Sequence, residues 1–339
     1  MHTDIVSSSL RELGAVALAT NVAVFMKRGT RLAVVGVGAL GGHHARIYSE
    51  LPDAELVAVV DIDPDKAQQV ASLYHCQSYS QYEEILDSVE AISLAVPTRE
   101  HARIGVEFLK RDVHVLVEKP IAQNLEEADQ LIQAQKKSGA LLQVGHTERF
   151  NPALLAVKPV VRQPQFFETH RLGIFVPRSL DVDVILDLMI HDLDIILHLV
   201  DSPIQEIRAV GIPVLTPRID IANARLQFEN GCVANVTASR VSREKIRKLR
   251  FFQPLEYVSI DFHKQEVEMF HLQEGETMQI AERHFEIERD EPLRLELQTF
   301  LNAIAGKKSS DQEPSGCSGE EGKRALELAL EVKNSALSP

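Results

Sequence analysis

The spacing of hydrophobic and polar residues changes near residue 150. Before that point, short continuous apolar runs alternate with segments of helical spacing, which is typical of parallel strands whose two faces are both covered by helices. The expected strands are 31–36, 55–61, 91–97, 113–120 and 140–145, and the helices between them include 99–110 and 124–138. The first part of the chain is therefore predicted to be a doubly wound α/β domain.

After about Asn151 the pattern differs. One strongly helical segment, 183–200, precedes six stretches in which apolar and polar residues alternate: 205–214, 219–228, 231–240, 246–253, 256–263 and 265–272. Asn230 and Gly231, between two of these stretches, are a hairpin signal because both residues adopt positive φ readily. Two further helices are expected near 291–306 and 320–336. The second part is therefore predicted to be an α/β domain with a large, open, mostly antiparallel sheet.

The composition is that of an ordinary soluble protein, with 45% hydrophobic and 25% charged residues among 339. The formal net charge is −13 and no block is rich in Lys and Arg, which argues against a nucleic-acid-binding protein. The three cysteines, Cys76, Cys232 and Cys317, lie far apart and form no CxxC pair. This spacing argues against a disulfide scaffold or a zinc ribbon and favours the reducing cytoplasm.

No apolar run reaches the roughly 18 residues that span a bilayer, so no membrane association is expected. The longest run, Leu13–Met26, resembles the apolar region of a signal peptide. However, the basic residues Lys27 and Arg28 follow this run, whereas those of a signal peptide precede it. We therefore interpret 1–25 as an N-terminal extension, 26–148 as the first domain and 149–339 as the second.

A glycine-rich motif follows the first expected strand. Residues 36–41 read GVGALG and match the dinucleotide-binding pattern GxGxxG between a strand and a helix. The first glycine permits a tight turn, the second lets the backbone approach a pyrophosphate, and the third allows close packing of helix on strand. The helix N-terminus adds free N–H groups and a positive dipole end. The expected dinucleotide contacts are Gly36, Gly38, Ala39, Leu40 and Gly41, and the alternative is a glycine turn that binds nothing.

Further contacts to the dinucleotide are expected at the carboxyl ends of the next strands. Asp61 ends the second strand, twenty residues after Gly41, where a carboxylate accepts hydrogen bonds from an adenosine ribose. Because it would repel a 2′-phosphate and no arginine follows it directly, NAD is favoured over NADP. Pro97, Thr98 and His101 follow the third strand and are interpreted either as cofactor neighbours or as a helix cap and surface residues.

Glu118, Lys119 and Pro120 end the next strand at the same edge. Lys119 is expected to contact both cofactor and substrate, where it either stabilises an alkoxide by hydrogen bonding or, with a pKa lowered by burial, acts as a base. Glu118 is expected beside the cofactor. The alternative is a surface ion pair, which contributes little to stability.

The helix expected over 183–200 carries Asp187, His191 and Asp194, which share one stripe of an α-helix because they are four and seven residues apart. Polar side chains on an otherwise apolar helix are costly to bury without a purpose. A carboxylate that orients a histidine is a usual general-base arrangement. Two alternatives are a core histidine with satisfied hydrogen bonds and a metal site, although no third ligand has convincing spacing.

These motifs together resemble the glucose–fructose oxidoreductase, inositol dehydrogenase and MocA family. The resemblance runs from about Arg31 to Leu199 through GVGALGGHHA, VDIDP, AVPTREH, VEKP and the D-x-x-x-H helix. It implies an NAD(P)-dependent oxidoreductase acting on CH–OH groups, with an N-terminal Rossmann domain and a C-terminal α/β domain. It also implies that Lys119 and His191 carry proton transfer with Asp187 as the accompanying carboxylate, and that the protein is a homodimer or homotetramer. Because no third ligand has convincing spacing, no metal is expected.

Residues 145–152, GHTERFNP, resemble the branch of that family that acts on nucleotide-linked amino sugars, particularly UDP-N-acetylglucosamine 3-dehydrogenases. The segment leaves the last Rossmann strand, so it is expected to line an interdomain cleft. Asn151 is expected to bind a substrate hydroxyl or acetamido group, and Arg149 either binds a phosphate or sugar oxygen or forms an interdomain salt bridge. The expected reaction is NAD-dependent oxidation of a secondary hydroxyl of a UDP-sugar. The alternatives are a dehydrogenase of inositols, free sugars or tetrapyrroles, and a non-catalytic dinucleotide sensor.

Both NAD and a UDP-sugar are anions, whereas the chain is acidic. The binding site must therefore reverse the average charge locally. The candidates for this reversal are the helix N-terminus at Gly38 to Gly42, Lys119, Arg149 and, further along, Arg171 or Arg178.

Overall fold

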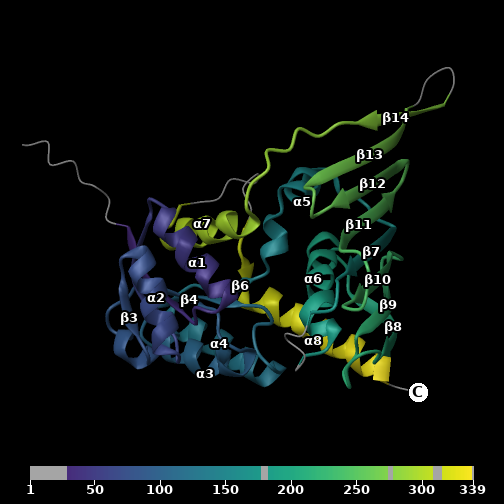
Figure 1. The fold of residues 1–339 in the computed structure, drawn as a ribbon. Coiled ribbons are helices and arrows are strands. Elements are labelled where there is room, and N and C mark those ends of the chain that lie inside the picture. Colours follow the sequence, from purple (N-terminus) through teal and green to yellow (C-terminus); the bar gives the residue numbers. More distant parts are fainter. Residues whose placement is uncertain (1–28, 177–181, 274–277, 308–314, 338–339) are drawn as a thin grey trace, which may run out of the picture.

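The computed structural model describes residues 29–176, 182–273, 278–307 and 315–337, and it contains two sheets with helices packed on them (Figure 1). The extension predicted over 1–25 and the residue Arg178 lie outside these ranges. Across the described ranges, no helix combines the length and apolar character needed to cross a bilayer.

The first sheet has seven strands in the order β15-β6-β5-β4-β1-β2-β3. Its parallel strands are β1 (Thr30–Val35), β2 (Ala54–Val60), β3 (Gln77–Tyr79), β4 (Ala91–Leu94), β5 (His114–Glu118) and β6 (Leu142–Gly145). The chain order reverses between β1 and β4, and open α/β sheets bind ligands outside the carboxyl ends of the strands at such a point. The predicted Rossmann domain is thus confirmed, and its ligand-binding edge is defined by topology.

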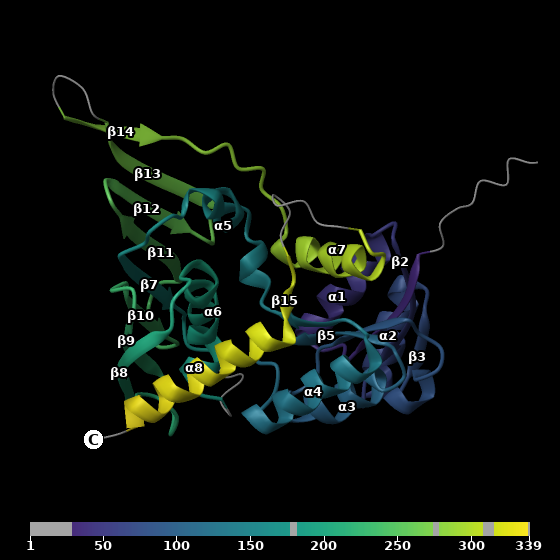
Figure 2. The same ribbon diagram turned by 180° about the vertical axis from the view of Figure 1, so that it is seen from behind.

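Helices cover both faces of this sheet (Figures 1 and 2). They are α1 (Ala39–Glu50), α2 (Pro64–Tyr74), α3 (His101–Leu109) and α4 (Leu125–Ser138), with short 3-10 turns η1 (Tyr82–Ile85) and η2 (Thr98–Glu100). Leu32 and Val34 of β1 belong to one apolar core with α1 and α2, whereas Ala33 and Val35 belong to another with α3 and α4. Alternate residues of a strand point to opposite faces, which explains why β1 is apolar throughout.

The second sheet has eight strands in the order β14-β13-β12-β11-β7-β10-β9-β8 and is antiparallel except between β7 and β10. The six predicted strands are β8 (Ile204–Ile212), β9 (Ile221–Phe228), β10 (Val233–Ser239), β11 (Ile246–Gln253), β12 (Glu256–Asp261) and β13 (Glu266–Gln273), and the sequence analysis missed β7 (Phe166–Leu172) and β14 (Gln279–Arg283). The hairpin between β9 and β10 turns at Gly231, where φ is +86°. The prediction of a large, mostly antiparallel sheet is confirmed.

One face of the second sheet packs on helices, and the chain then returns to the first sheet. The remaining elements are η3 (Thr147–Phe150), α5 (Pro152–Val157), η4 (Lys158–Val160), η5 (Ile185–Met189), α6 (Ile190–Leu199), α7 (Pro292–Ile304), β15 (Cys317–Ser318) and α8 (Gly319–Leu337). Leu297 and Phe300 of α7 lie in one core with α1, and β15 pairs with β6. We call the first sheet with its helices the first unit, and the second sheet with its helices the second unit. The segment predicted as a second domain from 149 to 339 therefore contributes α7 and β15 to the first unit.

Two buried arginines connect the segment after β6 with the second unit. The Arg149 guanidinium, 5% exposed, donates from Nε and Nη2 to the two carboxylate oxygens of Asp194 at 2.7 and 2.6 Å, and from Nη1 to Glu321 at 2.7 Å. Arg171 of β7 forms the same two-point contact with Asp192 and also donates to Glu148 at 2.8 Å. The η3 turn is thus joined to α6, α8 and β7 by charged hydrogen bonds that water does not screen.

We predict that Arg149→Ala lowers the free energy of unfolding by about 3–5 kcal/mol, because it leaves the Asp194 carboxylate buried without its partner. Denaturant titration of the full-length protein measures this change. The control is Arg208→Ala, which removes an ion pair to Glu206 whose arginine is 76% exposed and should change stability by less than about 1 kcal/mol. Equal effects of the two substitutions would contradict the structural role of Arg149.

Candidate active site

The glycine turn between β1 and α1 leaves room for a ligand at one position only. At Gly36, φ is +88° and an added Cβ would lie 2.6 Å from the Ala95 oxygen, while at Gly41 it would overlap the Gly36 oxygen. At Gly38, which is exposed, an added Cβ would meet no atom within 4 Å. The first and third glycines are therefore required by the fold, whereas the second faces open space. This is the arrangement that a pyrophosphate needs in order to approach the backbone.

The start of α1 also suits an anion. Gly38 is its N-cap and provides no side-chain cap, and the first turn contains no acidic residue. The free N–H groups and the positive end of the helix dipole therefore lie at the exposed residues Gly38, Ala39 and Leu40, where an anion can reach them. These are the features by which the turn fits a bound dinucleotide.

Asp61 lies directly beside this turn. One carboxylate oxygen accepts a hydrogen bond from the Val37 N–H at 2.9 Å and the other from the Asp63 N–H at 3.0 Å. Each oxygen keeps a second lone pair, so the carboxylate can still accept hydrogen bonds from a ribose diol. The position predicted for Asp61 is thus compatible with its predicted role, which stays a prediction.

Pro97 and Thr98 follow β4 next to the glycine turn, with Pro97 exposed and Thr98 half-buried. His101 differs from them because it is only 1% exposed and both its ring nitrogens lie 3.0 Å from backbone carbonyl oxygens, those of Pro120 and Val96. Burial lowers the pKa of His101. The ring therefore ties the ends of β4 and β5 together, and its nitrogens face the protein and not a cofactor.

Glu118 also faces the interior of the protein. It is 6% exposed, and its carboxylate lies 3.1 Å from Nε2 of the buried His44. Nδ1 of His44 lies 3.1 Å from the Ser93 hydroxyl, which in turn contacts Tyr48 at 2.9 Å. Instead of the predicted cofactor contact, Glu118 joins β5 to α1 and β4 through a buried polar chain and fixes the strand end from which Lys119 projects.

Lys119 contacts the helical segment of the second unit. Its Nζ donates to the backbone oxygen of Asp187 at 2.7 Å and lies 3.5 Å from the Asp187 carboxylate. The Lys119 side chain is 18% exposed and that of Asp187 33%. The cationic group thus lies at the carboxyl edge of the first sheet, where η5 meets it, and remains accessible.

The predicted contact between Asp187 and His191 is wrong. The segment Ile185–Met189 is a π-helical turn in which the Ile190 N–H bonds to the Ile185 oxygen, five residues back. This wider turn shifts side chains out of the stripe that α-helical spacing assumes. Among the described residues Asp187 pairs with Lys119, and it does not orient the imidazole.

His191 lies beside His146, the residue that follows β6. The two rings meet edge to face with centroids 6.4 Å apart, and His191 Nδ1 is buried without a partner within the described ranges. Burial lowers the pKa of His191 well below its usual range, and the positive charges of Lys119, Arg171 and Arg247 act in the same direction. His191 is therefore a neutral imidazole near pH 7 that can accept a proton.

Three residues predicted to bind substrate or to supply positive charge are engaged elsewhere. Arg149 forms the salt bridge that was its alternative, and Arg171 is only 3% exposed in its contacts with Asp192 and Glu148. Asn151 caps α5 by accepting from the Ala153 N–H and donates to the Phe262 oxygen. The reason is common to all three. Each lies in, directly after or against the η3 turn, which is packed between the two units and not along an open surface.

Sequence reasoning missed His146, Glu296 and Arg247. Glu296 of α7 is fully buried beneath the site, where its carboxylate accepts from the Thr147 hydroxyl at 2.7 Å. Burial and the nearby Glu118 raise the pKa of Glu296 well above its usual range, which favours the protonated form. No local sequence pattern predicts that Glu296 lies near the site, because α7 is far along the chain from the strands that it covers.

His146, Asp194 and Cys317 place their potential ligand atoms within 4.8 Å of one another. A metal ion does not fit there, because Arg149 already takes both Asp194 oxygens and its positive charge would lie beside the ion. Burial also raises the pKa of the Cys317 thiol well above its usual range, and the thiol form is a poor ligand.

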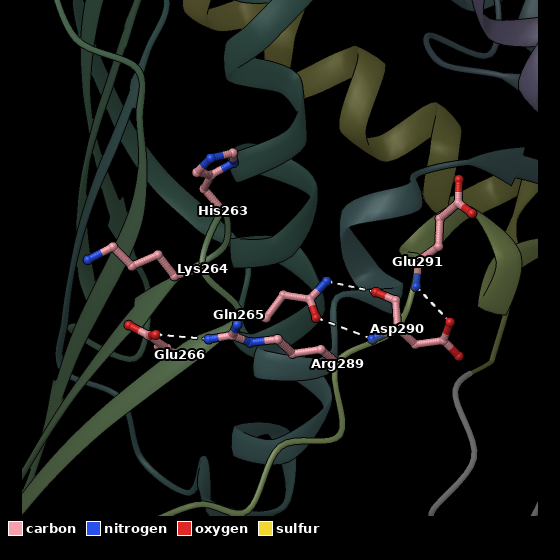
Figure 3. Close-up of a pocket in the computed structure, with 7 residues that line it drawn as sticks. All are labelled: His263, Lys264, Gln265, Glu266, Arg289, Asp290 and Glu291. Carbon is pink, nitrogen blue, oxygen red and sulfur yellow. Dashed lines mark hydrogen bonds and ion pairs between the residues drawn. The ribbon is translucent and has the colours of Figure 1, made fainter.

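A hollow of about 690 Å³ lies away from these residues (Figure 3). It lies between the β12–β13 turn and the segment that leads into α7. Gln265 donates to the Asp290 oxygen at 2.7 Å, and Arg289 pairs with Glu266 at 3.0 Å, so its walls are joined to each other. None of the predicted site residues lines it.

Comparison with known proteins agrees with this geometry. Residues 30–146 match the model of the oxidoreductase family with an NAD-binding Rossmann fold, and residues 157–252 match the GFO/IDH/MocA C-terminal domain. The chain is 36% identical to the UDP-N-acetylglucosamine 3-dehydrogenase of Acidithiobacillus ferrooxidans over 89% of its own length and 96% of that protein. It is 26% identical to the myo-inositol 2-dehydrogenase of Thermotoga maritima over 90% and 96% of the two chains.

Solved structures show the same fold. The A. ferrooxidans enzyme has a TM-score of 0.82 at 35% identity, over 91% of this chain and 97% of that chain. A levoglucosan dehydrogenase in complex with NADH and levoglucosan reaches a TM-score of 0.80 at 18% identity over the same shares of the two chains. The resemblance inferred from the sequence motifs is confirmed: this chain is an oxidoreductase and belongs to the GFO/IDH/MocA family.

Proposed function

We propose that this protein oxidises a secondary hydroxyl of a sugar nucleotide with NAD⁺, namely the 3-hydroxyl of UDP-N-acetylglucosamine. The observation that carries the proposal is the approach of Lys119 and the neutral His191 at the carboxyl edge of the Rossmann sheet, the edge that also carries the glycine turn. The choice of substrate is supported by the similarity to the A. ferrooxidans enzyme over nearly the full length of both chains.

The roles of the two residues follow from their chemistry. When bound, the dinucleotide supplies the hydride acceptor for the carbinol carbon. His191 is neutral and has a lone pair for the hydroxyl proton, whereas the Lys119 ammonium has donors only. We assign proton acceptance to His191 and stabilisation of the developing oxyanion to Lys119, which the Asp187 carbonyl oxygen holds in place.

We also propose a cytoplasmic homo-oligomer. Cys76, Cys232 and Cys317 are free thiols, as is usual in a reducing compartment. The outer face of the second sheet exposes large apolar side chains, among them Phe252 and Phe270, which a partner subunit would cover.

We predict that Gly38→Ala weakens NAD binding at least tenfold while the melting temperature stays unchanged. The added methyl group meets no protein atom, but it occupies the space proposed for the pyrophosphate. Gly42→Ala, whose methyl group also meets no protein atom, is the control and should bind NAD normally. Titration of NAD and NADP against both variants and wild type measures this, and because of Asp61 we expect NAD to bind wild type more tightly.

We predict that Lys119→Met lowers kcat by about 10²–10⁴, because the oxyanion loses its charged donor, while NAD affinity stays within about twofold. The control is Lys323→Met, which removes a comparably buried lysine whose Nζ pairs with Asp129 at 2.6 Å, away from the site. Steady-state rates of NADH formation give kcat. Full activity of Lys119→Met would contradict the assigned role.

We predict that the acidic limb of kcat/KM lies below pH 6.5. A histidine base is active above its pKa, and the folded protein lowers the pKa of His191, so activity is retained as the pH falls to about 6.5 and is lost only at lower pH. His191→Gln should lose this limb and about 10²–10⁴ in rate. His284→Gln, at an exposed histidine, is the control. A limb that persists in His191→Gln would assign the base elsewhere.

The substrate is tested by NADH formation with UDP-N-acetylglucosamine, UDP-glucose, N-acetylglucosamine and myo-inositol. We expect turnover with UDP-N-acetylglucosamine and a product whose mass is lower by two hydrogens. Turnover with free polyols and none with UDP-sugars would replace the proposed substrate by the inositol alternative. No turnover with any alcohol, together with NAD binding, would favour a sensor.

A further inference from the structure

A nucleotide-sugar substrate brings a diphosphate into the site. Arg149 and Arg171, the arginines first considered as its partners, are neutralised by carboxylates of the protein. Arg149 and Arg171 are 5% and 3% exposed, and each holds a buried aspartate through two hydrogen bonds and a glutamate through a third. A cation that binds substrate must keep donors free and reach solvent.

Arg247 at the start of β11 meets both conditions. Its side chain is 39% exposed, and its one carboxylate contact within the described ranges is to Glu148, at 3.3 Å from Nη1. Arg247 shares strand parity with the buried residues Leu249 and Phe251, so it projects from the face of the sheet that packs on helices. Its remaining guanidinium donors therefore emerge at the edge of that face.

The position of Arg247 carries an energetic cost. It is the cross-strand neighbour of Arg171, and like charges directly opposite one another destabilise a sheet. A single oxygen of Glu148 lies between them, 2.8 Å from Arg171 and 3.3 Å from Arg247, and Arg171 has Asp192 in addition. The two carboxylates balance the two guanidinium groups, but Arg247 has only the longer of the two contacts to Glu148, so its other donors remain available to an anion from solution.

Arg247 is also linked to the proton-accepting residue by contacts. Its partner Glu148 follows His146 by two residues, and the His146 ring meets that of His191 with centroids 6.4 Å apart. In agreement with this, the charge of Arg247 is one of the causes that lower the pKa of His191. In a nucleotide sugar the diphosphate is attached to C1, which one ring carbon separates from C3. A cation close to the group that receives the C3 hydroxyl proton is therefore well placed for the phosphate of the same sugar.

We propose that Arg247 binds the diphosphate of the nucleoside diphosphate sugar and thereby selects nucleotide-linked over free sugars. This inference rests on the proposed function and adds a specificity-determining residue to it. The exposed residues Arg243 and Lys245 lie just before Arg247 in the chain and add positive charge to this part of an acidic protein, which supports an anion-attracting edge at this point.

Arg247→Gln, Arg247→Lys and Arg250→Gln test the proposal in the full-length protein. Arg250 is a matched control, because it lies on the same strand with opposite parity, is 38% exposed and pairs with Glu168 at 3.0 Å. For each protein we would measure kcat and KM for UDP-N-acetylglucosamine, KM for NAD, and inhibition by UDP and by uridine, which lacks phosphate. Melting temperatures show whether each variant is folded.

We expect Arg247→Gln to raise KM for the UDP-sugar and the inhibition constant of UDP by about 10- to 100-fold, with inhibition by uridine, KM for NAD and kcat near wild type. Arg247→Lys should be intermediate, and Arg250→Gln unchanged. Removing the charge should also move the acidic limb of kcat/KM to higher pH, because the pKa of His191 rises.

Two results would overturn the inference. One is unchanged inhibition of Arg247→Gln by UDP, and the other is an equal loss of all affinities together with melting temperature, which a merely structural contact to Glu148 would give. If wild type fails to oxidise UDP-sugars yet binds UDP through Arg247, the inference stands and the proposed substrate falls. If wild type oxidises UDP-N-acetylglucosamine and Arg247→Gln binds UDP normally, the proposed substrate stands and the inference about Arg247 falls.

Discussion

The placement of α6 depends on two buried arginine–aspartate contacts. Asp192 and Asp194 lie two residues apart on α6, each is 1% exposed, and each is held through both oxygens by an arginine from another segment. Such pairs are favourable only when geometry and additional hydrogen bonds offset desolvation, and here Glu321 and Glu148 complete them. His191 directly precedes Asp192, so these contacts also fix the imidazole relative to Lys119.

Much of the fold could be predicted from the sequence because most strands follow a simple period. β9 alternates buried and exposed residues along its whole length, and the hairpin after it is marked by Asn230 and Gly231. β7 was missed because its buried positions include Thr169 and Arg171, so the strand does not alternate apolar with polar. Its inward arginine makes sense only with Asp192 across from it, which no local pattern shows.

The positions of the candidate site residues could be predicted in part for the same reason. The sequence predicts one sheet edge for Gly36 to Gly41, Asp61 and Lys119, and they lie there because strand ends and glycine turns are local features, while their roles stay predictions. Asp187 was misplaced because a π-turn cannot be read from spacing. The roles of Arg149 and Asn151 were ambiguous, because whether a polar residue binds substrate or protein depends on what packs over it. Arg247 was missed because its neighbours on β7 are distant from it in the sequence.

Burial opposes charge in the interior beneath the site. It lowers the pKa of His146 and of His191 and raises that of Glu296, so all three are shifted towards their neutral forms. The cations proposed to contact the substrate, Lys119 and Arg247, lie at the accessible edge of this interior. An acidic protein can present a cationic site in this way without changing its overall charge.

Helix α8 packs both in the hydrophobic core of the second sheet, through residues such as Leu328, and in a core of the first sheet, through Leu326. With 19 residues it is about 28 Å long. Near its start Gly322 packs on Val144 of β6, and near its end Ser335 accepts a hydrogen bond from the Ala209 N–H of β8. Unfolding of either unit alone would remove part of the packing of this helix and weaken the other unit as well. We therefore expect the two units to unfold together, and a loss of C-terminal turns of α8 to destabilise the Rossmann unit too.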